Sequence, residues 1–178
     1  MKKILVHSCC APCSTYPYKK LSDEGFLVKG YFYNPNIFPV EEYNRRLNEF
    51  KEYMNKNDID YYIQDANFLE WEDLTLSLKN EKEGGERCTL CFKIRLELAA
   101  IFAKSNGFDA FTTVLTVSPH KNSRIINEIG SEFAKKHDIA FIEENFKKQE
   151  GFKKSLIISK ENNLYRQSYC GCKYSILK

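Results

Sequence analysis

Short apolar segments alternate with longer helical patterns along most of this chain. The predicted strands cover residues 2–7, 27–33, 60–64, 110–115 and 139–142. The predicted helices cover residues 14–24, 41–55, 68–78, 87–105 and 123–136, with a further helix over 152–160. Strands separated by helices of about ten or more residues are typical of βαβ units. The alternation therefore predicts an α/β fold, with a mainly parallel five-stranded sheet and helices on both faces.

The length of the chain fits one α/β domain over residues 1–178. Within it, residues 145–178 form a basic segment that carries the last two cysteines, and we expect this segment to close the site. No stretch approaches the ~20 apolar residues of a membrane span, and the first residues have the pattern of a strand rather than of a signal peptide. We therefore expect a cytoplasmic protein with reduced thiols and no membrane partner. The net charge of +3 permits contact with nucleic acid without requiring it.

The seven cysteines fall into three groups: Cys9-Cys10-Ala11-Pro12-Cys13, Cys88-Thr89-Leu90-Cys91 and Cys170-Gly171-Cys172. The first group follows the first strand, and sites in parallel sheets lie outside the carboxyl ends of the strands. The loop after the fourth strand, residues 118–122, should share that edge. The second group starts a helix that precedes the fourth strand, so the sheet alone does not place it there. Only a loop packed back over the edge would bring it in.

The first two groups suit metal binding. Cys88 and Cys91 are three residues apart at a helix N-terminus, where thiolates are favoured. Four thiolates suit either zinc or an iron–sulfur cluster. A structural zinc site on the Cys-x-x-Cys pairs 10–13 and 88–91 would leave three thiols unexplained. A thioredoxin-like dithiol of Cys10 and Cys13 would ignore the second group, and isolated buried cysteines would not produce three groups.

The third group differs because one glycine separates its two cysteines. Such a pair can close into a strained, easily reduced disulfide. A disulfide and a dithiol differ by two electrons. The seven cysteines therefore divide into four for a cluster, two for a redox-active pair and one remaining thiol.

Other residues are candidates for the same site. His120, in the loop after the fourth strand, is a candidate proton donor. Arg87 precedes Cys88, and it either screens negative cluster charge or lies in solvent at a helix start. His7 and His137 have the positions of structural histidines. Basic and aromatic residues near the last cysteines form either a solvated amphipathic segment or a surface that contacts phosphates and stacks on bases. They are Lys153, Lys154, Tyr165, Arg166 and Tyr169.

Four motifs in combination resemble a known family. They are Cys-Cys-Ala-Pro-Cys at 9–13, Glu-Arg-Cys-Thr-Leu-Cys-Phe at 86–92, Thr-Thr-Val-Leu at 112–115 with Ser-Pro-His at 118–120, and Tyr-Arg-Gln-Ser-Tyr-Cys-Gly-Cys at 165–172. They are similar to those of the cobalamin-independent epoxyqueuosine reductases (the QueH type), over residues 4–175. The resemblance implies the last step of queuosine biosynthesis, in which an epoxide on the wobble nucleoside of a tRNA is reduced to an alkene and the oxygen leaves as water. It also implies the Rossmann-like nucleotide-binding fold of ATP pyrophosphatases, with cysteines replacing the phosphate loop and no use of ATP.

The same resemblance implies a [4Fe-4S] cluster and no cobalamin. Carried over by position, the cluster ligands are Cys9, Cys10, Cys88 and Cys91. Cys170 and Cys172 are then the redox-active pair, and Cys13 is a further thiol near the site. A second metal ion beside the cluster is compatible with the family. The expected partners are the anticodon stem-loop of a tRNA carrying epoxyqueuosine and an unidentified electron donor.

Two other functions stay open from the residues alone. The first is a structural zinc module that binds RNA through its basic tail, which would be colourless and would hold stoichiometric zinc. The second is a thiol–disulfide oxidoreductase that uses Cys10 and Cys13. It would be indifferent to iron chelation, whereas a reductase with an iron–sulfur cluster would be brown.

Overall fold

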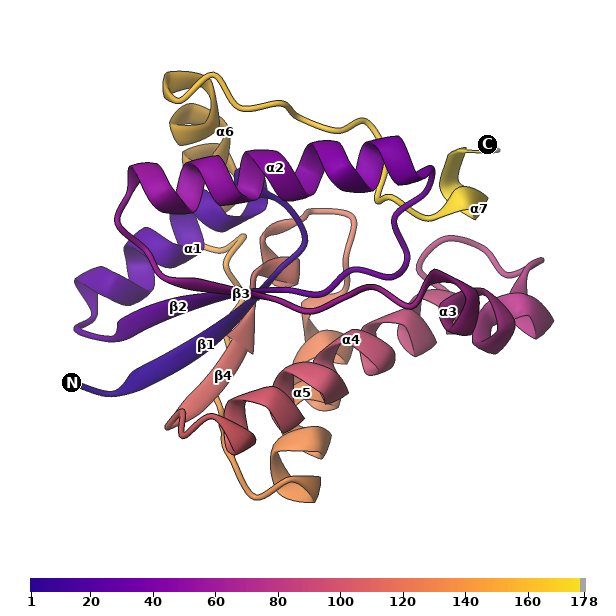
Figure 1. Ribbon diagram of the computed structural model, residues 1–178, viewed down its shortest axis with the longest axis horizontal. Helices are drawn as coiled ribbons and strands as arrows, with labels where there is room; N and C mark the ends of the chain where they lie inside the picture. The colour runs from indigo at the N-terminus through magenta and orange to yellow at the C-terminus, as the bar shows by residue number, and fades with distance from the viewer. Residues whose placement is uncertain (177–178) are drawn as a thin grey trace.

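The central feature of the computed structural model, which describes residues 1–176, is a five-stranded parallel sheet. Its strands are β1 (Lys3–Ser8), β2 (Leu27–Phe32), β3 (Tyr61–Ile63), β4 (Ala110–Thr113) and β5 (Ala140–Phe141). Their order across the sheet is β3-β2-β1-β4-β5, and all four pairings are parallel (Figure 1). The prediction of a parallel α/β sheet is confirmed.

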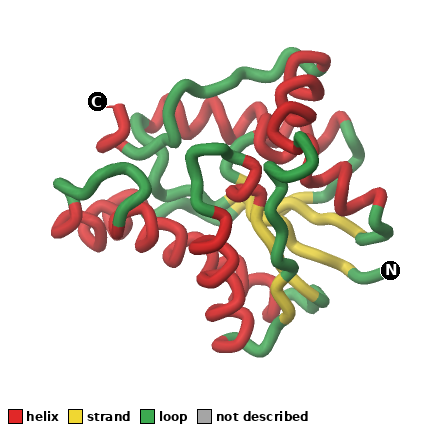
Figure 2. Tube along the Cα trace, turned by 180° about the vertical axis from the view of Figure 1, so that it is seen from behind, coloured by secondary structure: helices red, strands yellow, loops and turns green. Residues whose placement is uncertain are grey.

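Helices cover both faces of the sheet, as predicted (Figures 1 and 2). One layer holds α1 (Ala11–Asp23), α2 (Val40–Lys56) and α6 (Gly151–Glu161). The other holds α3 (Phe68–Thr75), α4 (Glu86–Ser105) and α5 (Ser123–Lys136). Two 3₁₀ turns, η1 (Leu76–Leu78) and η2 (Val114–Val117), and the short helix α7 (Lys173–Ile176) complete the described elements. Among residues 1–176, no helix is both long and apolar enough to cross a membrane.

Strand β1 lies at the centre of the sheet and decides where the first cysteines lie. Its residues Ile4, Leu5 and Val6 are fully buried, as expected for a strand that is covered on both faces. His7 lies opposite Tyr31 of β2 on one side and Thr113 of β4 on the other. The chain therefore leaves β1 at the middle of the carboxyl edge, and the first cysteine group begins there.

Two predicted boundaries were wrong near this edge. Helix α1 begins at Ala11 rather than at Ser14, because Pro12 occupies its first turn, where its missing N–H costs nothing. Ser14 does not cap the helix but donates to the Cys10 carbonyl. Strand β4 ends at Thr113 rather than at residue 115, since the Thr113 hydroxyl accepts from the Leu115 N–H and turns the chain into η2. Because α1 begins at Ala11, Cys13 lies inside a helix.

Two side chains depart from the usual burial pattern of their helices. Leu74 is exposed, and α3 ends at Thr75 before the 3₁₀ turn η1, so this helix is shorter than the predicted 68–78. On α2 the buried face includes Arg46, which is only 1% exposed, beside Tyr43 and Phe50. A charged side chain in that position needs hydrogen-bonding partners inside the protein.

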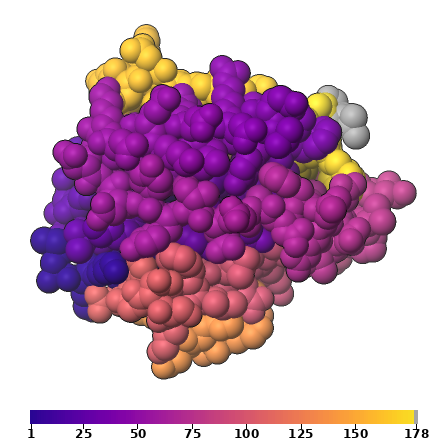
Figure 3. Space-filling model, in the orientation of Figure 1, coloured from indigo at the N-terminus to yellow at the C-terminus, as the bar shows by residue number. Residues whose placement is uncertain are grey.

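The end of the chain runs back over the structure as an irregular segment, here called the C-terminal strap (residues 162–172). It leaves α6, passes along α2 and reaches α7 on the side where α3 lies (Figure 1). In the space-filling view most of this face belongs to residues of the second quarter of the chain, and C-terminal residues emerge along the upper edge and on the right (Figure 3). The strap thus crosses the carboxyl edge of the sheet.

Candidate metal and redox site

Two adjoining cavities open at the carboxyl edge. The smaller one, about 120 Å³, is lined by five thiols from three segments of the chain: Cys9, Cys88, Cys91, Cys170 and Cys172. The larger one, a cleft of about 610 Å³, is lined by Cys9, Cys13 and Cys170 and by the loop 117–121. The loops after β1 and β4 therefore share one edge, as predicted. The segment before α4 packs back over the same edge and brings the second cysteine group with it.

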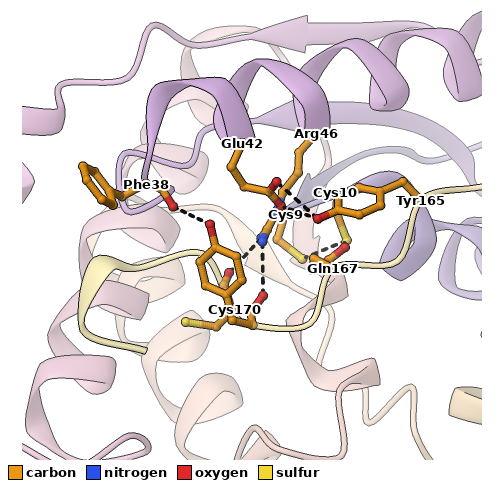
Figure 4. A network of polar contacts seen from close by, with 9 residues as sticks. Cys9, Cys10, Phe38, Glu42, Arg46, Tyr165, Gln167 and Cys170 are labelled. Carbon is orange, nitrogen blue, oxygen red and sulfur yellow. Dashed lines mark hydrogen bonds and ion pairs between the residues drawn. The ribbon is translucent and has the colours of Figure 1, made fainter. Parts of the chain in front are cut away.

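The first cysteine group is compact and buried. The Sγ atoms of Cys9, Cys10 and Cys13 all lie within 4.8 Å of one another. Cys9 lines both cavities, whereas Cys13 lines only the cleft and Cys10 is among the lining residues of neither. Instead, the Cys10 sulfur accepts a hydrogen bond of 3.0 Å from Gln167 Nε2 of the strap (Figure 4).

The three thiols of this group differ in acidity. Hydrogen bonds from the Cys10 and Cys13 thiols lower the pKa of Cys9 well below its usual value, and the charges of Lys121 and Arg95 act in the same direction. Burial raises the pKa of Cys10 to about 12. Cys9 therefore carries a negative charge more readily than Cys10 does.

The second group receives hydrogen bonds from nearby N–H groups. The backbone N–H of Gly84 donates to Cys88 Sγ at 3.2 Å, and the indole N–H of Trp71 donates to Cys91 Sγ at 3.3 Å. Burial raises the pKa of Cys91, while Arg95 and the Trp71 hydrogen bond oppose that rise. Such N–H···S contacts are among the factors that tune metal-bound thiolates.

The two arginines of α4 have different roles. Arg87 is 2% exposed, so the interpretation of it as a solvated residue was wrong. Its Nη1 donates to the carbonyls of Leu78, Lys79 and Glu81, at 3.1, 3.2 and 2.6 Å, and so closes the loop before Cys88. Arg95 is a second buried cation beside the thiols, and it was not predicted from the sequence. Its spacing of four residues from Cys91, on the same helix face, was the available signal.

The third group lies in the strap. Ser175 Oγ is 3.1 Å from Cys170 Sγ and 3.6 Å from Cys172 Sγ. A hydrogen bond from the Cys172 thiol lowers the pKa of Cys170 to about 5, and the same contact raises the pKa of Cys172. Cys172 also packs with Trp71 and Cys91 in a small apolar cluster. The described cysteines form no disulfide, so this pair is a dithiol with one thiolate.

The remaining candidates divide by their distance from the cleft. His120 lines both cavities and is exposed, and Arg166 and Tyr169 line the cleft. The other three lie outside it and have partners of their own. Lys153 forms an ion pair with Glu150, and the Lys154 ammonium lies 5.2 Å from the centre of the Tyr16 ring. The guanidinium carbon of Arg45 lies 3.3 Å from the centre of the Tyr165 ring.

Other cleft residues were not predicted. Lys121 lines both cavities, and it follows His120 in a loop that was already singled out. Gln167 Oε1 and Ser155 Oγ are buried and have no hydrogen-bond partner among residues 1–176, although both residues line the cleft. Unpaired polar atoms at a cleft are positions that a polar ligand can satisfy. Ser155 had no signal in the sequence, because it lies within an ordinary helical pattern.

Two histidines are structural, as predicted. His7 is fully buried and hydrogen-bonds Thr113 Oγ1 and the Tyr33 carbonyl, both at 3.0 Å. Burial lowers its pKa to about 4, so its ring is neutral. His137 pairs with Glu97 at the end of α5, away from both cavities.

The thiols of the first two groups fit a metal cluster by their chemistry. All are cysteine sulfurs, the donors that hold iron–sulfur clusters and structural zinc. Arg95 and Lys121 supply positive charge next to Cys9, and N–H groups point at Cys10, Cys88 and Cys91. The site can therefore carry the negative charge of several thiolates within the protein.

Comparison with known proteins gives a consistent result. The family described as "Epoxyqueuosine reductase QueH" matches residues 4–178. A protein of that name from Acinetobacter baylyi is 41% identical over 98% of this chain and 80% of its own length. Another from Staphylococcus epidermidis is 37% identical over 99% of this chain and 77% of its own length.

Solved structures of low sequence identity share the fold. A predicted subunit of tRNA methyltransferase from Methanocaldococcus jannaschii superposes with a TM-score of 0.63 at 11% identity, over 94% of both chains. The U34-tRNA thiolase NcsA from Methanococcus maripaludis, solved with its [4Fe-4S] cluster, gives a TM-score of 0.60 at 13% identity, over 98% of this chain and 61% of NcsA. These two similarities support the α/β architecture alone.

Proposed function

Because this chain belongs to the epoxyqueuosine reductase QueH family, we propose that it reduces epoxyqueuosine to queuosine at the wobble position of tRNA. The observation that carries the proposal is the convergence of five thiols, from three distant segments, on one small cavity beside a cleft of about 610 Å³. A cleft of that size suits a small organic ligand such as a modified nucleoside. The enzyme would act in the cytoplasm, where thiols stay reduced.

In this proposal Cys9, Cys10, Cys88 and Cys91 hold a [4Fe-4S] cluster. When bound, such a cluster supplies electrons one at a time at a potential set by its surroundings. Cys10 would turn from Gln167 to serve as a ligand, and Cys13 would stay at the cleft wall. Arg95 and Lys121 would balance the thiolate charge, as they already do for Cys9.

The cleft would receive the substrate nucleoside. Tyr169 provides an aromatic wall, and Arg166 and Lys121 provide positive charge for phosphates. We assign base stacking to Tyr169 rather than to Tyr165, because Tyr169 lines the cleft and Tyr165 does not. Lys153 and Lys154 follow the cleft residue Phe152 on α6, where they would contact phosphates further along the anticodon stem-loop.

The reaction balances with the dithiol of the strap. Conversion of an epoxide to an alkene and water consumes two electrons and two protons. With Cys170 as a thiolate, closure of the Cys170–Cys172 disulfide releases two electrons and one proton, and the second proton comes from solvent. His120, which lines both cavities, would pass a proton to the departing oxygen. An external electron donor would then restore the dithiol.

An anaerobic assay tests this function. The purified protein is incubated with a chemical reductant and tRNA that carries epoxyqueuosine, and the wobble nucleoside is analysed by mass spectrometry. We expect loss of one oxygen atom from the nucleoside, and we expect Cys88→Ala to abolish both the conversion and the visible iron–sulfur spectrum. Full conversion by Cys88→Ala without a cluster would contradict the proposal. A colourless protein with stoichiometric zinc would support the zinc module instead.

A further inference from the structure

A side chain of helix α2 fixes two carbonyl groups of the turn that carries Cys170 and Cys172. Arg46 donates from Nη1 to the Cys170 carbonyl at 2.9 Å and from Nη2 to the Tyr169 carbonyl at 3.1 Å (Figure 4). A guanidinium is planar and presents its N–H groups in a rigid fork, so two successive carbonyls are fixed together. The orientation of the peptide unit between Tyr169 and Gly171 therefore depends on Arg46.

Arg46 is itself held in place by a hydrogen bond to a neighbouring side chain. Its side chain is buried, and its Nε donates to Glu42 Oε1 at 2.7 Å, one helical turn earlier. Glu42 also accepts a hydrogen bond of 3.2 Å from the Tyr165 hydroxyl of the strap. A buried guanidinium that loses these partners would be left unpaired at a large cost. Arg46 is therefore held in one position.

The glycine between the two cysteines is closely packed against its neighbours. Gly171 has φ of +123°, and a Cβ at this position would lie 3.0 Å from Arg46 Nη1 and 3.0 Å from Ile37 Cγ1. The Phe38 N–H donates to the Gly171 carbonyl at 2.7 Å. The turn is thus packed between Arg46 and the loop before α2, with both thiols on the small cavity.

We propose that Arg46 is a positioning residue that holds the Cys170-Gly171-Cys172 turn in its dithiol form and thereby sets the redox equilibrium of the pair. The inference rests on the proposed function, in which this pair is redox-active. Closing the disulfide brings the two sulfurs to about 2.0 Å with a restricted dihedral angle. In this proposal the peptide units on both sides of Gly171 rotate when the bond closes, and the hydrogen bonds to Arg46 are lost. Arg46 consequently favours the dithiol.

Lysine cannot replace this function. Its ammonium group is a point donor on a flexible stem and cannot fix two carbonyls in one plane. Arg46→Lys therefore keeps the charge and loses the fork. The neighbouring Arg45 offers a matched control, because it is exposed and contacts the Tyr165 ring rather than the cysteine turn.

The test measures the equilibrium of the pair with glutathione. Cys170 and Cys172 lose two electrons and one proton and form one S–S bond, while glutathione disulfide takes up these electrons, that proton and one proton from the buffer to give two molecules of glutathione. Anaerobically purified protein without tRNA is equilibrated in buffers of defined glutathione ratio and quenched with acid. The peptide containing residues 170–172 is then quantified by mass spectrometry after thiol labelling.

We expect Arg46→Lys to shift this equilibrium at least tenfold toward the disulfide, which corresponds to about 30 mV for a two-electron couple. Arg45→Lys should stay within twofold of the wild type. A purely structural role for Arg46 would lower the melting temperature and leave the equilibrium unchanged. An equilibrium for Arg46→Lys that is unchanged, or shifted toward the dithiol, would overturn the proposal.

A second variant keeps the test decisive if Arg46→Lys does not fold. Glu42→Gln leaves Arg46 in place and weakens the partner that orients it, so it should shift the equilibrium in the same direction by a smaller factor. No shift in Glu42→Gln would then overturn the proposal. Failure of the proposed function looks different. A wild-type protein whose pair responds to glutathione as described, but which leaves epoxyqueuosine unchanged, contradicts the function and not the role of Arg46.

Discussion

The first cysteine group and the cysteine pair of the strap serve one site but are held in different ways. Cys9 and Cys10 leave the central strand and enter α1, so the sheet and a helix determine their positions. Cys170 and Cys172 lie outside any strand, and side chains and backbone groups of other segments hold them through hydrogen bonds. Metal ligands need a fixed geometry, whereas a dithiol that opens and closes needs a segment that can move. The difference matches the two roles that we propose.

Each of the two regions also contains one cysteine of lowered pKa. Hydrogen bonds from neighbouring thiols lower the pKa of both Cys9 and Cys170. Both cysteines line the two cavities, but Cys9 is only 8% exposed, whereas Cys170 is only partly buried. Cys9 and Cys170 therefore both have a lowered pKa, and they differ mainly in their exposure to solvent.

The largest expected effect follows from removing one thiol of the strap. Cys172→Ser cannot form the disulfide, so it cannot deliver two electrons and should convert epoxyqueuosine only at the background rate. It should nevertheless keep the visible spectrum of the wild type, because this thiol is not among the proposed ligands. Nucleoside mass analysis and absorption spectra on the same sample check both statements. Loss of the visible spectrum in Cys172→Ser would contradict the division of roles, because Cys172 would then be needed for metal binding.

A second prediction concerns thiol reactivity in the metal-free protein. The pKa of Cys170 is about 5, so its alkylation rate should rise as the pH increases through about 5 and level off above it. Cys9 should react more slowly at pH 7 although its pKa is also lowered, because it is only 8% exposed whereas Cys170 is partly buried. Timed alkylation followed by peptide mass analysis measures both rates. A Cys170 rate that still rises steeply between pH 8 and 9 would show that no thiolate is present there at neutral pH.

A smaller effect distinguishes how each region is held. Gly171→Ala places a methyl group 3.0 Å from Arg46 Nη1 at a positive φ, so it should loosen the strap by about 1–3 kcal/mol. Gly25→Ala is the matched control, since it also has a positive φ but nothing within 4 Å of the added carbon. Hydrogen exchange of residues 162–172 should increase in the first variant and not in the second. Equal exchange in both would contradict close packing of the strap.

Much of the fold followed from local patterns. The alternation of strands and helices predicts the parallel sheet, because each βαβ unit is encoded by residues close in sequence. The boundaries at Ala11 and Thr113 were missed because they depend on individual hydrogen bonds and on one proline. Arg46 was missed because a charged residue in a helical pattern ordinarily faces solvent, and only tertiary partners explain its burial beside Tyr43 and Phe50.

The cysteine motifs indicated the chemistry of the site, and the topology brought the loops after β1 and β4 to one edge. The positions of the other groups could not be derived in that way. Arg87 was known only as a neighbour of Cys88, and its burial depends on the carbonyls of residues 78–81. Trp71 and Gln167 contact thiols that are distant in sequence, and such pairings have no local signal.

Iron and sulfide analysis of anaerobically purified variants tests the division of the site most directly. The account predicts about four iron and four sulfide ions per chain for the wild type and for Cys170→Ser, as in a [4Fe-4S] cluster. It predicts loss of iron and sulfide in Cys10→Ser, because Cys10 is a proposed ligand from the first cysteine group. Iron and sulfide retained in Cys10→Ser but lost in Cys170→Ser would contradict the account, since the strap would then hold the metal.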